Sequence, residues 1–286
     1  MLLQILRTYL RPYKREIGYV MGLQLVATIA SLSLPSLNAD IIDQGVVLGD
    51  TAYIIRTGGW MLGVTLLQIG CTMAAVYLGA RSAMAFGRDV RSAFFSRVAS
   101  FSSREVGKFG APSLITRNTN DVQQVQMLVM LGFTLMVSAP IMMVGGVIMA
   151  LREDVGLSWL VAAAVPVLVA ATGFLISRMV PGFRRMQRYL DDVNRVMREQ
   201  ITGIRVIRAF VREPYEADRF GAANDDLTDV SINVGRWMSA MFPTVMFVMN
   251  ASSVAVLWFG GIRIDEGLMQ IGALTAFITY LVQILM

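Results

Sequence analysis

Six long stretches of this chain contain no Asp, Glu, Lys or Arg, and each meets or approaches the length that crosses a lipid bilayer. They cover residues 17–39, 57–80, 127–151, 157–177, 237–262 and 267–286. A hydrocarbon core about 30 Å thick requires about 20 apolar helical residues. A buried helix of a soluble protein can imitate one such stretch, but hardly six. The pattern therefore predicts an all-α membrane protein with six transmembrane helices.

The basic residues predict how these helices are oriented. All of the 25 basic residues except Arg56, Arg152 and Arg263 fall within three segments, 1–16, 81–126 and 178–236. Lys and Arg accumulate in cytoplasmic loops, so we expect a cytoplasmic N-terminus and a multi-pass protein of the cell (plasma) inner membrane. Nucleic-acid binding is not favoured, because the charges flank apolar stretches. The expected organisation is an amphipathic elbow helix at 1–16, spans at about 17–42, 57–80, 127–151, 157–177, 237–262 and 267–286, and cytoplasmic segments 81–126 and 178–236.

Several kinds of chemistry are excluded by composition. Cys71 is the only cysteine and histidine is absent, so an intrachain disulfide, His-ligated zinc and Ser-His-Asp or Cys-His catalysis are impossible within this chain. The phosphate-binding pattern G-x-x-x-x-G-K-[ST] is missing, since Gly107-Lys108 is followed by Phe109 and lacks the upstream glycine. We expect no catalytic residue, no metal site and no cofactor bound by this chain.

The two long cytoplasmic segments carry helical periodicity. Apolar residues recur every three or four positions, which predicts that span two continues for about 22 residues, or roughly 33 Å, into the cytoplasm. Reversals are expected at 107–112 and near Glu213-Pro214, which makes each segment a long helical hairpin. The apolar stripes are Phe86, Val90, Phe94, Val98 and Phe101 in the first segment, and Phe183, Met186, Leu190, Val193, Met197, Ile201 and Ile204 in the second.

Four motifs, in order along the chain, resemble those of ATP-binding-cassette (ABC) exporters. Gly110–Asp121 (GAPSLITRNTND) is similar to a pattern on the first intracellular loop of that family, and Glu199–Phe210 (EQITGIRVIRAF) resembles the second loop. Tyr9–Lys14 (YLRPYK) and Gly272–Tyr280 (GALTAFITY) agree with motifs near the two ends. Together they cover essentially the whole chain, which is more specific than any one motif.

The resemblance implies the transmembrane domain of an exporter half-transporter of the type IV multidrug and lipid class. Such a domain forms a domain-swapped homo- or heterodimer with a second transmembrane domain, and ATP with Mg binds to separate nucleotide-binding domains. The departures are Pro112, Asn118 and the absence of a nucleotide-binding domain. The sequence ends at Met286 with the sixth apolar stretch, so we expect a natural continuation. Coupling helices are implied near 109–117 and 211–220, with contact residues Phe109, Gly110, Ser113, Leu114, Arg117, Asp121, Phe210, Arg212, Glu213, Tyr215, Glu216, Arg219 and Phe220.

Polar residues within the spans are candidates for a substrate pathway, namely Asn38, Asp40, Gln68, Asn250 and Gln283. Hydrogen bonding between helices is the alternative role for the amides, and Asp43 is expected to begin the outer loop. The expected function is that of the membrane-spanning half of an ATP-driven exporter for an amphipathic or hydrophobic substrate. The alternative is a secondary transporter or channel subunit without an ATPase, which would carry short inner loops and intramembrane carboxylates.

Overall fold

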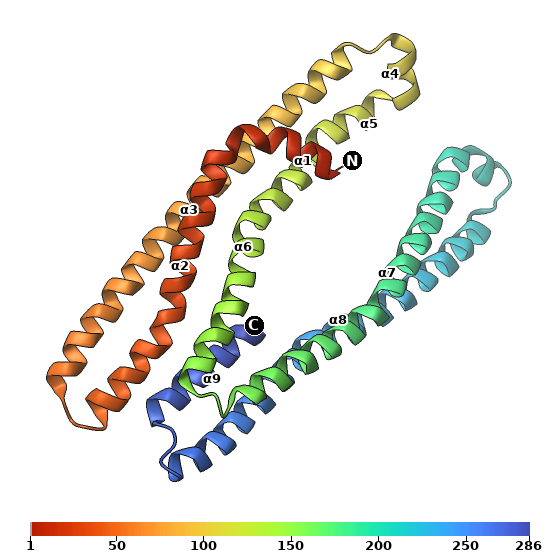
Figure 1. Ribbon diagram of the computed structural model, residues 1–286. Helices are drawn as coiled ribbons and strands as arrows, with labels where there is room; N and C mark the ends of the chain where they lie inside the picture. The colour runs from red at the N-terminus through yellow and green to blue at the C-terminus, as the bar shows by residue number, and fades with distance from the viewer. Residues whose placement is uncertain (1) are drawn as a thin grey trace. The chain divides into compact units, whose positions relative to one another are not determined.

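The computed structural model describes residues 2–286, and every regular element in this range is helical. The chain divides into two compact units (Figure 1). The first comprises the residues up to Ser158, Leu257–Ile284 and Met286, and the second comprises Trp159–Val256 and Leu285. The helices are α1 (Leu2–Leu10), α2 (Lys14–Asp40), α3 (Thr51–Ala99), α4 (Ser103–Phe109), α5 (Ala111–Thr116), α6 (Val122–Glu153), α7 (Ser158–Ala209), α8 (Glu213–Asp265) and α9 (Ile271–Leu285), with a 3₁₀ turn η1 (Arg11–Tyr13) and π-helical segments η2 (Ile41–Val46) and η3 (Arg117–Asp121).

Within residues 2–286, five helical segments are long and apolar enough to cross a membrane. They are Gln4–Val46, Thr51–Ala99, Ala111–Glu153, Ser158–Ala209 and Glu213–Asp265. The sixth apolar stretch forms a shorter helix, α9, of 15 residues, which rises about 23 Å. The all-α membrane fold is confirmed, whereas the count of six full-length spans is not.

In the first unit, α2 packs along α3, and both contact α6. Ala83 and Phe86 on α3 and Val129 on α6 form a buried core. The amphipathic helix α1 covers this core with a group of apolar side chains, Ile5, Leu6, Tyr9 and Leu10. Pro12 lies in η1, where the chain leaves α1 and enters α2. The N-terminal helix is therefore an integral part of this unit.

Two polar contacts attach α9 to the first transmembrane helix. The Gly272 N–H donates to the Asp43 carboxylate at 2.6 Å, and the buried Tyr280 hydroxyl donates to the Leu32 carbonyl at 2.7 Å. Asp43 lies in η2, which continues the helix as far as Val46. The expectation that Asp43 begins the outer loop is therefore wrong. Its carboxylate satisfies a donor in the first turn of α9, which is a favourable position for an anion.

A buried ion pair joins the loop after α6 to the end of α8. The Arg263 guanidinium lies 3.1 Å from the Asp154 carboxylate, whose side chain is almost completely buried. Asp154 also accepts the Leu157 N–H at 2.8 Å. A side chain at Gly156 would collide with this guanidinium. The glycine therefore leaves space for the guanidinium in the position that it occupies in this ion pair.

The second unit is a long hairpin of α7 and α8, which run side by side in Figure 1. Helix α7 has 52 residues, which corresponds to about 78 Å at 1.5 Å per residue. This length is more than twice the thickness of a hydrocarbon core. A large part of α7 must therefore project beyond the membrane as a continuous helix.

Candidate functional site

The first hairpin ends in a compact tip, which we define as residues 102–121. Helix α3 ends at Ala99, about three residues earlier than the continuation of about 22 residues expected after residue 80. Helix α4 starts at a capping box, in which the Ser102 hydroxyl accepts the Glu105 N–H and the Glu105 carboxylate accepts the Ser102 N–H at 2.8 Å. The donating Ser102 N–H, together with its hydroxyl, lowers the pKa of the Glu105 carboxyl below its ordinary value. Reciprocal capping restarts the helix after the turn.

Aromatic and cationic groups gather at this first tip. Phe109 stacks on Phe101 with ring centroids 5.9 Å apart, and the Arg117 guanidinium lies 5.9 Å from the Phe109 ring. Phe109 is nevertheless exposed, whereas Leu114 is buried. Gly110 has a φ of 77° between α4 and α5, a conformation that favours glycine. The tip therefore presents one anchored aromatic side chain to its surroundings.

The motif Arg117–Asp121 adopts a π-helical turn, η3. Such turns occur frequently at functional sites, because they displace backbone groups from the regular helical pattern. The buried Asn118 Oδ1 has no hydrogen-bond partner within residues 2–286. Ser113, Arg117 and Asp121 are exposed. The departure of Asn118 from the exporter pattern thus falls on a half-buried residue whose Oδ1 is buried.

The second tip, residues 210–220, begins with an unusual helix end. Arg212 N–H donates to the Ile207 carbonyl at 2.9 Å, and Val211 N–H donates to the Arg208 carbonyl at 3.3 Å. This pair of bonds is a Schellman motif, which places Val211 in the left-handed position that glycine normally occupies. Val211 has a φ of 51°, the only positive φ of a non-glycine residue in the described chain. A β-branched residue is strained in this conformation.

Large apolar side chains surround this strained turn. The exposed fractions are 73% for Phe210, 76% for Val211 and 59% for Tyr215. The Arg212 guanidinium lies 5.6 Å from the Tyr215 ring. Glu213 occupies the first turn of α8, where a negative charge is favourable. The second tip therefore combines an exposed apolar surface with adjacent charges of both signs.

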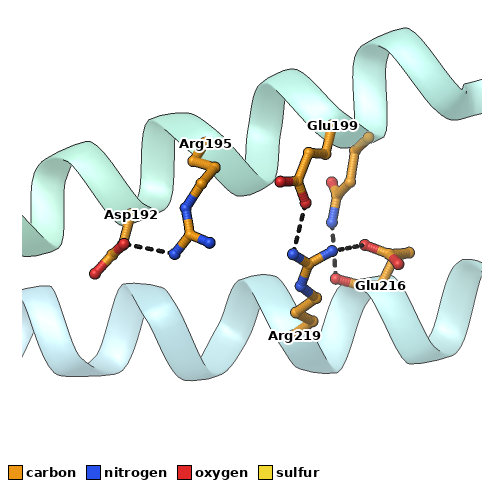
Figure 2. Close-up of polar contacts among 6 residues, drawn as sticks. Asp192, Arg195, Glu199, Glu216 and Arg219 are labelled. Carbon is orange, nitrogen blue, oxygen red and sulfur yellow. Dashed lines mark hydrogen bonds and ion pairs between the residues drawn. The ribbon is translucent and has the colours of Figure 1, made fainter.

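Polar contacts join the part of α8 that belongs to the second tip to α7, as Figure 2 shows. Arg219 on α8 pairs with Glu199 on α7 at 2.5 Å, and it also contacts Glu216 at 3.5 Å. The Gln200 amide donates to the Glu216 carbonyl at 2.8 Å. Further along α7, Arg195 pairs with Asp192 at 2.6 Å within the helix. Half-buried Phe220 lies in the same region of α8. These contacts hold the end of the hairpin together.

The candidate pathway residues differ in how exposed they are. Asn38 and Asn250 are exposed, while Asp40, Gln68 and Gln283 are partly buried. The Gln283 Oε1 is buried without a partner in the described part of the chain. Asn250 belongs to the second unit and the other four belong to the first. Their role in a substrate pathway stays a prediction.

The features that sequence reasoning missed include the left-handed Val211, the Asp154–Arg263 pair and the attachment of α9 through Asp43. The sequence does contain one indication of the α9 attachment, because Gly272 is the first residue of the motif Gly272–Tyr280. A Cβ atom at Gly272 would overlap with the Ala39 carbonyl oxygen and the Asp43 carboxylate. The glycine is therefore required by a helix contact.

Comparison with known proteins identifies the class to which this fold belongs. Residues 17–286 match the family model for the ABC transporter transmembrane region. The chain belongs to this family. It is a membrane protein domain of the type IV exporter-like kind, as the resemblance of its four motifs predicts.

Relatives with similar sequences agree with this family. The chain is 53% identical over 286 residues to an uncharacterized ABC transporter ATP-binding protein of Mycobacterium tuberculosis, covering 100% of this chain and 49% of that protein. It is 31% identical over 277 residues to an uncharacterized ABC transporter ATP-binding protein of Bacillus subtilis (97% and 48%). It is 23% identical over 286 residues to a putative multidrug export ATP-binding/permease protein of Bacillus subtilis (96% and 48%). The chain thus spans about half the length of the curated relatives it matches.

Proposed function

We propose that this chain is the membrane-spanning part of an ATP-driven exporter. With a second ABC transmembrane domain, identical or related, it forms the pathway for an amphipathic or hydrophobic substrate. ATP and Mg bind to nucleotide-binding domains, and the relatives named as ATP-binding proteins, about twice as long as this chain, support this division. The N-terminus and both hairpins lie in the cytoplasm, and the protein resides in the plasma membrane.

The observation that carries the proposal is the length and continuity of the second hairpin. From Arg178 to Ala209, α7 continues for about 48 Å beyond the fourth apolar stretch, as one continuous helix that contains Pro181 near the start of this segment. At its end stand exposed Phe210 and Tyr215. Aromatic residues are favoured at the centres of protein interfaces. A long helical hairpin with exposed aromatic side chains at its end is suited to bind an ATPase domain and to transmit its movement to the membrane.

The contact residues of the two tips have a mechanical role in this proposal and perform no chemistry. Tyr215 and Phe210 at the second tip, and Phe109 at the first, supply apolar anchors. Glu213 and Arg117 set the orientation of each tip against its ATPase partner. A secondary transporter or channel subunit without an ATPase is not favoured, because the chain belongs to the ABC family.

The proposal is tested by measuring coupling in the complete transporter reconstituted in vesicles. Glu213→Ala and Arg117→Ala are expected to lower the amount of substrate moved per ATP hydrolysed, while expression and thermal stability stay near those of the parent. Arg188→Ala is the matched control, because Arg188 is an exposed arginine on α7 away from the tip. If expression falls in parallel with transport, the two residues are structural and the coupling role is wrong.

A further inference from the structure

A groove with a basic lining lies on the α7–α8 hairpin near the ends of its apolar stretches. Its volume is about 750 Å³, and its lining includes Phe174, Arg178 and Arg185 from α7 and Asn233 and Trp237 from α8. This volume lies within the range of small-molecule sites, roughly 300–1,000 Å³. The fourth apolar stretch ends at residue 177 and the fifth begins at 237. The groove therefore sits at the level where these two stretches meet their polar continuations.

The two arginines of the groove differ from those near the second tip. Arg195 and Arg219 are paired with carboxylates on the same hairpin. By contrast, neither Arg178 nor Arg185 has an ion pair with any carboxylate in residues 2–286, and no Asp or Glu lines the groove. The two residues are seven positions apart, which places them on the same side of α7. They offer two uncompensated positive charges to an anion.

Aromatic rings hold one of these charges in place. The Phe174 ring lies 5.1 Å from the Arg178 guanidinium and meets the Trp237 ring edge-on, with centroids 6.2 Å apart. Trp is enriched at the membrane–water boundary, where its ring is apolar and its N–H is polar. The Asn233 amide lies one turn before Trp237 and adds a further donor to the lining. Arginine, tryptophan and amide groups thus converge at one depth.

Part of the groove lining is apolar and closely packed. A Cβ atom at Gly182 would lie only 2.6 Å from Val234 Cγ2, so the glycine lets the two helices approach closely. Val234 is buried. The lining of the groove therefore combines a closely packed apolar contact with charged and hydrogen-bonding side chains.

We propose that this groove binds the phosphate-bearing headgroup of an anionic phospholipid, with its acyl chains against the neighbouring spans. Arg178 and Arg185 contact the phosphate, and Trp237 packs at the boundary between headgroup and acyl chain. Basic sites between transmembrane helices on the cytoplasmic side bind such headgroups, and guanidinium groups match phosphate oxygens in geometry. The inference rests on the proposed membrane placement, but it requires neither ATP nor transport.

The test uses the intrinsic fluorescence of Trp237 in the complete transporter. Replacing Trp60, Trp159 and Trp258 of this chain, together with the tryptophans of the remaining domains, by Phe leaves Trp237 as the reporter. The protein is placed in phosphatidylcholine vesicles that contain increasing fractions of brominated phosphatidylglycerol, whose bromine atoms quench a nearby tryptophan. The quenching gives the binding preference for phosphatidylglycerol over phosphatidylcholine.

We expect phosphatidylglycerol to be preferred, with each arginine contributing about fivefold. Arg178→Gln with Arg185→Gln should reduce the preference to about one. The matched control, Arg184→Gln with Arg188→Gln, removes the same charge from α7 at positions outside the groove lining and should leave the preference unchanged. Thermal unfolding of each variant checks that it is folded.

Three results would overturn the proposal. A preference that survives the Arg178 and Arg185 substitutions would show that other groups bind the headgroup. An equal loss in the control pair would indicate general surface charge instead of a site. Relief of quenching by millimolar inorganic phosphate or glycerol phosphate would assign the groove to a soluble anion, because a lipid anchored by its acyl chains is not displaced at such concentrations.

Discussion

Replacing Val211 by glycine should stabilise the second tip while removing one of its exposed apolar side chains. A left-handed conformation costs an L-residue roughly 1–2 kcal/mol, and glycine relieves this cost. Glycine also lowers the free energy of unfolding by roughly 0.5–1 kcal/mol, because it has more conformational freedom in the unfolded chain. Little burial is lost, since Val211 is 76% exposed. The net gain expected from Val211→Gly is about 0.5–1 kcal/mol.

Hydrogen exchange measures this gain locally. The amides of Val211 and Arg212 are bonded to the carbonyls of Arg208 and Ile207, so they exchange only when the helix end opens. Val211→Gly should slow their exchange about twofold to fivefold, because about 1.4 kcal/mol corresponds to a factor of ten. Mass spectrometry of peptides covering residues 204–216 gives the rate.

The structure supplies a matched control at another helix end. Gly267 has a φ of 74°, and Leu268 N–H bonds to the Arg263 carbonyl in the same pattern as at Val211. Gly267→Ala should therefore accelerate exchange at Leu268. Exchange at Arg212 that is unchanged or faster in Val211→Gly, alongside the expected acceleration in the control, would refute the reasoning from backbone strain.

Two further predictions concern contacts within the first unit. Gly272→Ala should lower the thermal stability of the detergent-solubilised protein by roughly 1–3 kcal/mol, because its Cβ overlaps with the Asp43 carboxylate. Gly173→Ala, which has open space around it, should not lower stability, and equal behaviour of the two variants would contradict this account. Asp154→Asn should lower the free energy of unfolding by about 1–3 kcal/mol. This loss is smaller than for a fully buried ion pair, because Arg263 is partly exposed. Adding Arg263→Met should recover part of the loss in the same melting assay, and a double variant less stable than Asp154→Asn would contradict the ion-pair argument.

Much of the fold was predictable, because apolar runs and helical periods are local properties of a sequence. The long helix α7 follows from this kind of signal. The end of α3 at Ala99 was missed, although Ser102 and Glu105 have the spacing of a capping box. This capping-box pattern was present in the sequence, but the apolar periodicity of the segment predicted a longer helix.

Contacts between distant segments were not predictable. The bond from Gly272 to Asp43 joins residues 229 positions apart, and the bond from Tyr280 to Leu32 joins residues 248 positions apart. Periodicity shows that a helix face is buried, but it does not show which helix covers that face. Val211 is a different case, because valine disfavours positive φ. There the hydrogen bonds of the helix end prevail over the preference of the residue.

The central claim is that the hairpin tips carry movement from an ATPase domain to the membrane, and crosslinking tests it most directly. In the complete transporter with Cys71 and any cysteines of the other domains replaced by Ser, Tyr215→Cys is combined with single cysteines scanned over the ATPase surface, and Arg188→Cys is the control on the same hairpin. The account predicts crosslinks at Tyr215 whose yield changes when ATP is added, and none at Arg188. Failure of Tyr215→Cys to crosslink across the whole scan, in a transporter that still hydrolyses ATP, would contradict the account.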